Sequence, residues 1–213
     1  MKIRFSNAGK RFNREWIFRH LNLEFNSNTS YAVTGPNGSG KSTLLQCIGG
    51  MLQLSEGNVS YTLDKHVDPE NVFKHVSIAA PYLEVVEEMT LKEFLKFHKQ
   101  FKSFRQNLAI DQIIEIIGLS SATEKQIRNY SSGMKQRVKL AQCIFSDTDV
   151  VLLDEPCSNL DAAGIQLYHD LIKNYCSDRL VVVCSNDVVE YEFCKEQINM
   201  NELKNKLPLA GNQ

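Results

Sequence analysis

The chain has 213 residues, 43% of them hydrophobic, which is enough for one substantial globular domain. Its formal net charge of −1 provides no general attraction to nucleic acid or to anionic lipid, so we expect no nucleic-acid partner. The longest apolar runs are of strand length, short of the roughly 20 residues of a membrane-spanning helix, and the N-terminus has no apolar signal-peptide segment.

The first third of the chain is predicted to be mainly β-strand. Apolar and polar residues alternate through parts of residues 1–33, and Tyr31–Val33 forms a short strand before a glycine-rich turn. A helix is expected from about Lys41 to Ile48. Residues 57–80 are expected to form further strands, most clearly at Val76–Ile78.

The middle of the chain predicts a small helical insert, residues 82–130, within a single domain whose catalytic core is residues 1–81 and 131–213. Thr90 and Glu93 have the spacing of a capping box, which marks the start of a helix. The apolar residues expected on one face of that helix are Leu91, Phe94, Leu95 and Phe101.

The last third alternates helices and strands. Val150–Leu153 is a continuous apolar run, which suits a parallel strand covered on both faces. A helix from about Ala162 to Cys176 and a second apolar run, Leu180–Cys184, follow it. This order implies a βαβ crossover, and the expected fold is α/β, with a mainly parallel core sheet, an N-terminal antiparallel β subdomain and a small α-helical insert.

A phosphate-binding loop is predicted at residues 35–42, which read Gly-Pro-Asn-Gly-Ser-Gly-Lys-Ser and fit G-x-x-x-x-G-K-[ST]. Glycines let such a loop curl so that its amides point at phosphates, and the following helix adds the positive end of its dipole. Lys41 is expected to reach the β- and γ-phosphates of ATP, and the Ser42 hydroxyl to bind Mg²⁺. The other residues expected at the nucleotide are Gly35, Asn37, Gly38, Ser39, Gly40 and Thr43.

Two acidic residues complete the predicted ATP site. Asp154 and Glu155 follow the apolar run 150–153, at the strand end where open α/β sheets bind ligands. Asp154 is expected to hold the magnesium shell, and Glu155 to orient or deprotonate the attacking water. The pair is a weak signal alone and a specific one together with the P-loop.

Two further motifs flank these acids. Residues 130–134 read Tyr-Ser-Ser-Gly-Met before a predicted helix, and residues 158–161 read Ser-Asn-Leu-Asp. The arrangement resembles the ATP-binding subunits of ABC transporters over nearly the whole chain. The family's signature loop, commonly L-S-G-G-Q, matches at Ser131 and Gly133, with Ser132 in place of a glycine, and its S-x-L-D motif, the D-loop, matches residues 158–161.

The resemblance implies an ATPase subunit, two copies of which, identical or different, meet head to tail and enclose two ATP molecules. Ser131 and Gly133 would contact the γ-phosphate held by the partner copy. The helical insert would contact a separate transmembrane subunit, which would place the chain on the cytoplasmic face of the inner membrane. Phe12 stands where the family has an aromatic residue that stacks on adenine, with Trp16 as its substitute. The compact size and the Ser-Ser-Gly-Met variant are similar to subunits of the haem-exporter type.

Two residues of the family pattern are missing. Asn186 stands in place of a histidine near the γ-phosphate, and its amide can donate a hydrogen bond but cannot exchange a proton near neutral pH. A glutamine expected after the strand at Val76–Ile78 is replaced by residues 79–82, Ala-Ala-Pro-Tyr. Glu84 or Glu87 is a shifted substitute, or both are exposed loop residues. We therefore expect intact ATP binding with slow or partner-dependent hydrolysis.

Two other functions remain open at this stage. The chain could be an ABC-type ATP-dependent switch or assembly factor with weak hydrolysis and no transport role. A P-loop kinase of small metabolites would need an arginine-rich lid and no signature loop, so residues 130–134 argue against it. In the resembling family the membrane subunit selects the substrate, and this chain predicts none.

Overall fold

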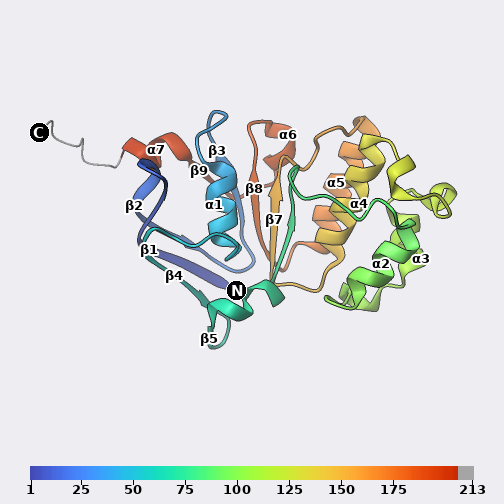
Figure 1. Ribbon diagram of the computed structural model, residues 1–213, viewed down its shortest axis with the longest axis horizontal. Helices are drawn as coiled ribbons and strands as arrows, with labels where there is room; N and C mark the ends of the chain where they lie inside the picture. Colours follow the sequence, from blue (N-terminus) through green and yellow to red (C-terminus); the bar gives the residue numbers. More distant parts are fainter. Residues whose placement is uncertain (206–213) are drawn as a thin grey trace, which may run out of the picture.

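The computed structural model describes residues 1–205, so the last eight residues of the predicted core segment 131–213 lie outside the described residues. Its centre is a five-stranded, wholly parallel sheet, in which neighbouring strands run β6-β7-β8-β3-β9 (Figure 1). The strands are β3 (Ser30–Thr34), β6 (Val76–Ala79), β7 (Val150–Asp154), β8 (Leu180–Cys184) and β9 (Glu196–Asn199). The predicted parallel core sheet is confirmed.

A second sheet is antiparallel and has the order β2-β1-β4-β5. Its strands are β1 (Lys2–Phe12), β2 (Glu15–Phe25), β4 (Glu56–Thr62) and β5 (His66–Val67). Ile3 and Phe5 of β1 are buried between exposed neighbours, which is the alternation that the sequence predicted. The expectation of strands throughout 57–80 was wrong in part, because Pro69–Lys74 is a 3₁₀ helix that begins at a proline.

Helices cover both faces of the parallel sheet. They are α1 (Lys41–Ile48), α4 (Ser132–Phe145), α5 (Ala162–Tyr175), α6 (Val188–Tyr191) and α7 (Met200–Asn205). Val150 and Leu152 of β7 pack in a cluster with α1 and the antiparallel sheet, whereas Val151 and Leu153 pack in a cluster with α4 and α5. Every residue of β7 is therefore buried, and the predicted β7-α5-β8 crossover between parallel neighbours is confirmed.

The predicted helical insert contains α2 (Leu91–Lys99), α3 (Ile110–Ile116) and short 3₁₀ turns, which lie at the end of the molecule opposite the antiparallel sheet (Figure 1). The capping box is confirmed, because the Thr90 hydroxyl accepts the Glu93 amide and the Glu93 carboxylate accepts the Thr90 amide. Phe101 does not lie on the buried face, since α2 ends before it and its side chain is 70% exposed. Within residues 1–205, no helix has both the length and the apolar character needed to cross a bilayer.

Candidate ATP site

The predicted P-loop joins the end of β3 to the start of α1 and frames a cavity of about 340 Å³. Residues 37–43 line this cavity together with Ile17 and Glu155. Gly40 caps α1 with a φ of +103°, and a Cβ atom there would lie 2.2 Å from Ile17 Cγ2. Only glycine combines that left-handed backbone with so close a neighbour. The amides at the start of α1 therefore remain open toward the cavity.

Two polar side chains of the loop are suited to an anion. Lys41 is 6% exposed, and its ammonium donates to the carbonyl oxygen of Gly35 at 2.6 Å. Ser39 Oγ is buried and has no hydrogen-bond partner among the described residues. An unpaired buried hydroxyl costs about 1–3 kcal/mol, and a phosphate oxygen in the loop would supply its partner. The loop thus fits the phosphates of ATP.

Asp154 and Glu155 lie at the carboxyl end of β7, beside the P-loop. Asp154 is 3% exposed; burial raises the pKa of its carboxyl group, and a hydrogen bond with Ser42 and the charge of Lys41 oppose that rise. A carboxylate and a hydroxyl side by side are ligands that Mg²⁺ accepts. Glu155 has a φ of +44°, and its amide donates to the Cys184 carbonyl at 2.9 Å. This sharp turn leaves its exposed side chain at the P-loop cavity.

Asn186 reaches the P-loop from the end of β8. Its side-chain oxygen accepts the Gly35 amide at 3.2 Å, and its side-chain nitrogen lies 3.4 Å from Asn37 Oδ1. The parallel pairing of β3 with β8 sets this distance, because both strands end at the same edge of the sheet. The structure therefore brings together Lys41, Ser42, Asp154, Glu155 and Asn186 from three separate parts of the sequence.

The predicted signature loop and D-loop form a second cavity of about 380 Å³, which shares no lining residue with the P-loop cavity. Ser131 caps α4, since its hydroxyl accepts the Met134 amide at 3.2 Å. Gly133 lies against the D-loop, where an added Cβ atom would be 2.9 Å from the Asn159 carbonyl oxygen. Asp161 caps α5. On one chain, the signature and the P-loop therefore line separate cavities.

Residues 18–158 match the ABC transporter family. The chain belongs to the ABC transporter family. As a member it is an ATP-binding ATPase domain. It has the α/β P-loop fold that the sequence predicted.

Relatives and solved structures agree with this membership. The chain is 29% identical over 205 residues to YhcH of Bacillus subtilis (strain 168), an uncharacterized ABC transporter ATP-binding protein, with 92% of this chain and 65% of YhcH covered. It is 28% identical over 191 residues to CcmA of Agrobacterium fabrum, a cytochrome c biogenesis ATP-binding export protein, with 87% and 88% covered. CcmA supports the predicted resemblance to haem-exporter-type subunits.

One solved structure shows the shared fold in a dimer. The ATP-binding cassette MJ0796, in a post-hydrolysis state bound to ADP and Pi, matches with a TM-score of 0.76 and 21% identity. The match covers 92% of this chain and 93% of that one. With YhcH, by contrast, this chain spans about two-thirds of the relative's length.

The two aromatic residues predicted to contact adenine differ in their surroundings. Phe12 ends β1 with its ring 48% exposed, and the Lys10 ammonium lies 5.1 Å from the ring centroid. Two guanidinium groups contact the Trp16 ring, and that of Arg19 lies 4.5 Å from the ring centroid. Trp16 is therefore a poor substitute for Phe12 at adenine. Ile17, which the sequence analysis missed, is the β2 residue that lines the P-loop cavity. Its strand pattern gave no signal of that contact.

The segment after β6, which lacks the family's glutamine, has a tyrosine hydroxyl and carboxylates in place of a side-chain amide. Burial raises the pKa of the Tyr82 hydroxyl, a hydrogen bond with Gln46 partly offsets the rise, and the nearby charge of Asp154 adds to it. Glu87 accepts a hydrogen bond from Lys135 at 2.6 Å, on α4. Neither Glu84 nor Glu87 lines the P-loop cavity, so the structure does not bring the shifted substitutes to the phosphates.

Proposed function

We propose that this chain binds ATP with Mg²⁺ and hydrolyses it as the ATP-binding subunit of an ABC transporter whose transmembrane subunit is a separate chain. The observation that carries the proposal is the P-loop cavity, where the buried Ser39 hydroxyl lacks a partner among residues 1–205 and Lys41 supplies a cation. Ser42 and Asp154 would hold Mg²⁺, which neutralises charge on the phosphates. Glu155 would orient or deprotonate the attacking water.

Three further groups would take part at the nucleotide. Lys41 would exchange its contacts with the Gly35 and Pro36 carbonyls for the β- and γ-phosphates. Asn186 would donate its side-chain amide to the γ-phosphate, because it already contacts the loop that holds it. The exposed ring of Phe12 would stack on adenine.

Two copies are needed to enclose ATP on both sides. The signature cavity and the P-loop cavity have no residue in common, so Ser131 and Gly133 would act on ATP bound to another copy. The MJ0796 cassette shares this fold and is dimeric, which supports a pair of copies. The partner would be an identical chain or a related one.

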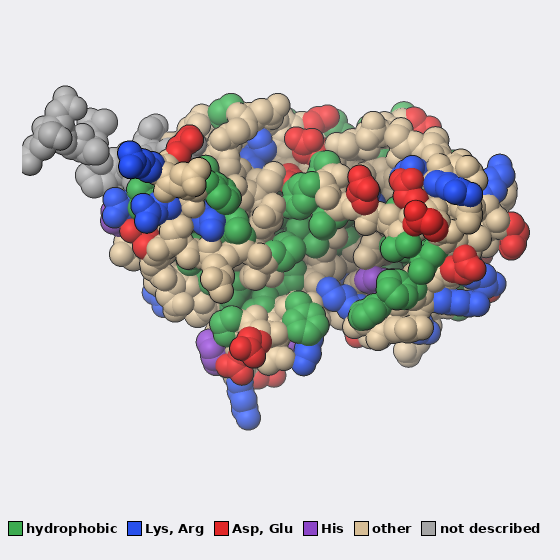
Figure 2. All heavy atoms as spheres, in the orientation of Figure 1, with side chains coloured by type: hydrophobic (Ala, Val, Ile, Leu, Met, Phe, Trp, Pro, Cys, Tyr) green, Lys and Arg blue, Asp and Glu red, His purple; other side chains and the backbone are tan. Residues whose placement is uncertain are grey.

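The surface supports a membrane partner. Hydrophobic side chains gather across the middle of the face in Figure 2. Large apolar side chains that are exposed after α1, before and after β6 and on the insert are Met51, Phe73, Tyr82, Leu83, Val86, Phe97 and Phe101. Apolar groups exposed in such numbers mark a partner surface. We propose that residues 82–130 form the subdomain that docks on the transmembrane subunit, at the cytoplasmic face of the inner membrane.

One observation favours the second function, an ABC-type switch or assembly factor with weak hydrolysis. Asn186 contacts the P-loop and has no group that titrates near neutral pH, and no glutamine directly follows β6. A chain of this kind would bind ATP and release it slowly. Co-purification with a multi-spanning membrane protein would separate it from a transporter subunit.

The test is ATP turnover beside ATP binding. The wild-type chain should bind ATP with Mg²⁺ and turn it over well below the enzyme median of about 10 s⁻¹. Glu155→Gln should keep the binding and lose at least about 100-fold in turnover, as expected for a general base. Asn186→His, as a gain-of-function control, should raise turnover. Equal turnover in wild type and Glu155→Gln would refute the assigned role of Glu155, and absence of ATP binding would refute the function.

A further inference from the structure

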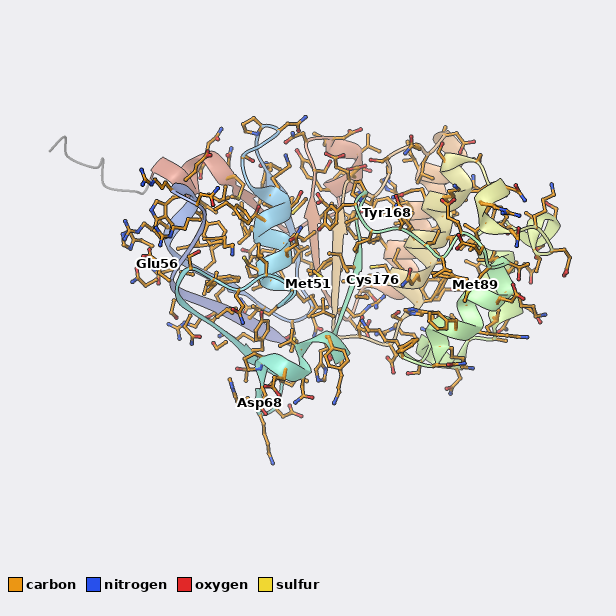
Figure 3. All side chains as sticks on the ribbon, in the orientation of Figure 1. Met51, Glu56, Asp68, Met89, Tyr168 and Cys176 are labelled. Carbon is orange, nitrogen blue, oxygen red and sulfur yellow. The ribbon has the colours of Figure 1, made fainter. Side chains whose placement is uncertain are left out.

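A third cavity, of about 420 Å³, lies at the opposite end of β3 from the P-loop. Its walls come from residues 28–30, which lead into β3, and from α5 and the first residues of β8. Cys176, just after α5 and labelled in Figure 3, is one of its lining residues, and Lys195 closes it near β9. None of these residues belongs to the ATP site, because that site sits where β3 and β8 end.

The lining of this cavity combines apolar and basic residues. Its apolar residues are Ile172, Cys176, Val181 and Phe193. Its basic side chains are His169, Lys173, Arg179 and Lys195, and the described lining contains no Asp or Glu. A small-molecule site typically combines mostly apolar walls with a few polar groups, in volumes of about 300–1,000 Å³.

Arg179 is the unusual member of this lining. It is 2% exposed, yet within residues 1–205 no carboxylate lies within ion-pairing distance of it. Its guanidinium donates to the carbonyl oxygens of Ser146 at 3.0 Å, Ile144 at 2.5 Å and Tyr175 at 2.8 Å, so carbonyl groups near the ends of α4 and α5 surround it in place of a carboxylate. A buried cation without a counter-ion is rare and costly.

Unpaired nitrogen atoms add to the excess of positive charge and of hydrogen-bond donors at this cavity. Arg179 Nε and His169 Nε2 are both buried without a hydrogen-bond partner among the described residues. The nearest acidic group to the His169 ring is Glu192, whose carboxylate lies 3.5 Å from Nδ1 on the other side of the ring. Lys173 and Lys195 are exposed at the cavity, where an incoming anion would meet them first.

We propose that this cavity binds a small amphipathic carboxylate, a molecule with an apolar chain and one negative charge. The chain lies against Ile172, Val181 and Phe193, and the carboxylate faces Lys173 and Lys195. Its charge supplies the counter-ion that the buried Arg179 lacks. The site is independent of the proposed ATPase function, since its lining and the P-loop lining do not overlap.

The test uses octanoate as the probe, with octanol and acetate as matched controls that lack the charge and the chain. Calorimetric titration should show octanoate binding at least tenfold tighter than either control. The chain has five histidines, so ¹⁵N-histidine NMR reports the place of binding. Octanoate should shift the His169 ring signals and leave those of His20, His66, His75 and His98 in place.

Charge reversal locates the carboxylate. Lys173→Glu should weaken octanoate binding at least tenfold, whereas Lys125→Glu, the same change at an exposed position outside the cavity, should not. Ser177→Trp, at an exposed lining residue, should block the cavity and abolish the His169 shift. Octanol binding as tightly as octanoate, or octanoate binding that shifts other histidines or survives Lys173→Glu, would overturn the proposal.

Discussion

His98 shows how a single buried side chain joins the helical insert to the core. Its ring stacks on Phe104, with centroids 5.8 Å apart, and its Nε2 lies 2.8 Å from Ser146 Oγ. Its Nδ1 lies 3.3 Å from the side-chain nitrogen of Gln142 on α4, so Nδ1 accepts and Nε2 donates. Only the neutral ring can do both. Burial, together with the charge of Lys102, lowers the pKa of His98 to about 4.

This lowered pKa predicts a loss of stability in mild acid. The unfolded chain takes up a proton at His98 near pH 6.5, and the folded chain does so only near pH 4. The stabilisation is therefore complete above about pH 6.5 and falls as pH drops toward 4. Between pH 6.5 and 4.5 the wild type should lose roughly 1–2 kcal/mol more unfolding free energy than His98→Gln, after allowance for partial exposure.

Urea unfolding of both proteins at several pH values measures this difference. His66→Gln, at an exposed histidine for which no such burial exists, is the matched control and should follow the wild type. Parallel curves for wild type and His98→Gln across this range would show that His98 is not the proton-linked group.

At the scale of elements, the start of α2 depends on one side chain. The Thr90 hydroxyl accepts the Glu93 amide, and the Thr90 amide donates to the Glu93 carboxylate at 2.8 Å. Burial of Leu91, Phe94 and Leu95 then packs the helix into the core. The cap and the apolar face thus fix where α2 begins and how it is turned.

Removing this cap should destabilise the protein by about 1 kcal/mol. Thr90→Ala deletes the acceptor and leaves the Glu93 amide without its partner, whereas Thr90→Ser keeps the hydroxyl. The midpoint of urea unfolding should fall for Thr90→Ala and stay near the wild-type value for Thr90→Ser. Equal midpoints for the two variants would contradict the role of the cap.

Local patterns explain which elements could be predicted from the sequence. The apolar run at Val150–Leu153 and the capping box at Thr90 are short-range signals, and both were read correctly. Residues 69–74 were assigned to strand because their composition is ambiguous, and Phe101 was placed on α2 although the helix ends at Lys99. Periodicity alone does not show where a helix stops.

The parts of the site that depend on distant contacts were harder to predict. Ile17 meets the P-loop only because the antiparallel sheet folds over α1, and no local motif marks it. The contact of Asn186 with Gly35 follows from the order of strands in the sheet. The P-loop itself was predictable residue by residue, because the local backbone conformation of the loop requires its glycines.

At the scale of the whole molecule, the cavity of the P-loop and the cavity of the signature loop are separate. The P-loop cavity lies between β3 and α1, whereas the signature cavity lies at the start of α4 beside the D-loop. One rigid chain cannot close both around the same nucleotide. We therefore propose that a second copy completes the site by presenting its signature to the first, and that ATP promotes this association.

The last prediction tests this dimer with Ser132, an exposed residue that lines the signature cavity at the first position of α4. Glu155→Gln should form an ATP-dependent dimer in size-exclusion chromatography, because ATP is held without hydrolysis. Adding Ser132→Glu should abolish that dimer, because the new carboxylate would face the phosphates bound by the partner. An acidic residue in the first turn of a helix interacts favourably with the helix dipole, so the fold and ATP binding by the monomer should persist.

Ser103→Glu, at an exposed serine that lines neither cavity, is the control and should leave the dimer intact. A dimer that survives Ser132→Glu would place the signature outside the interface, and the closure of ATP between two copies would then be wrong.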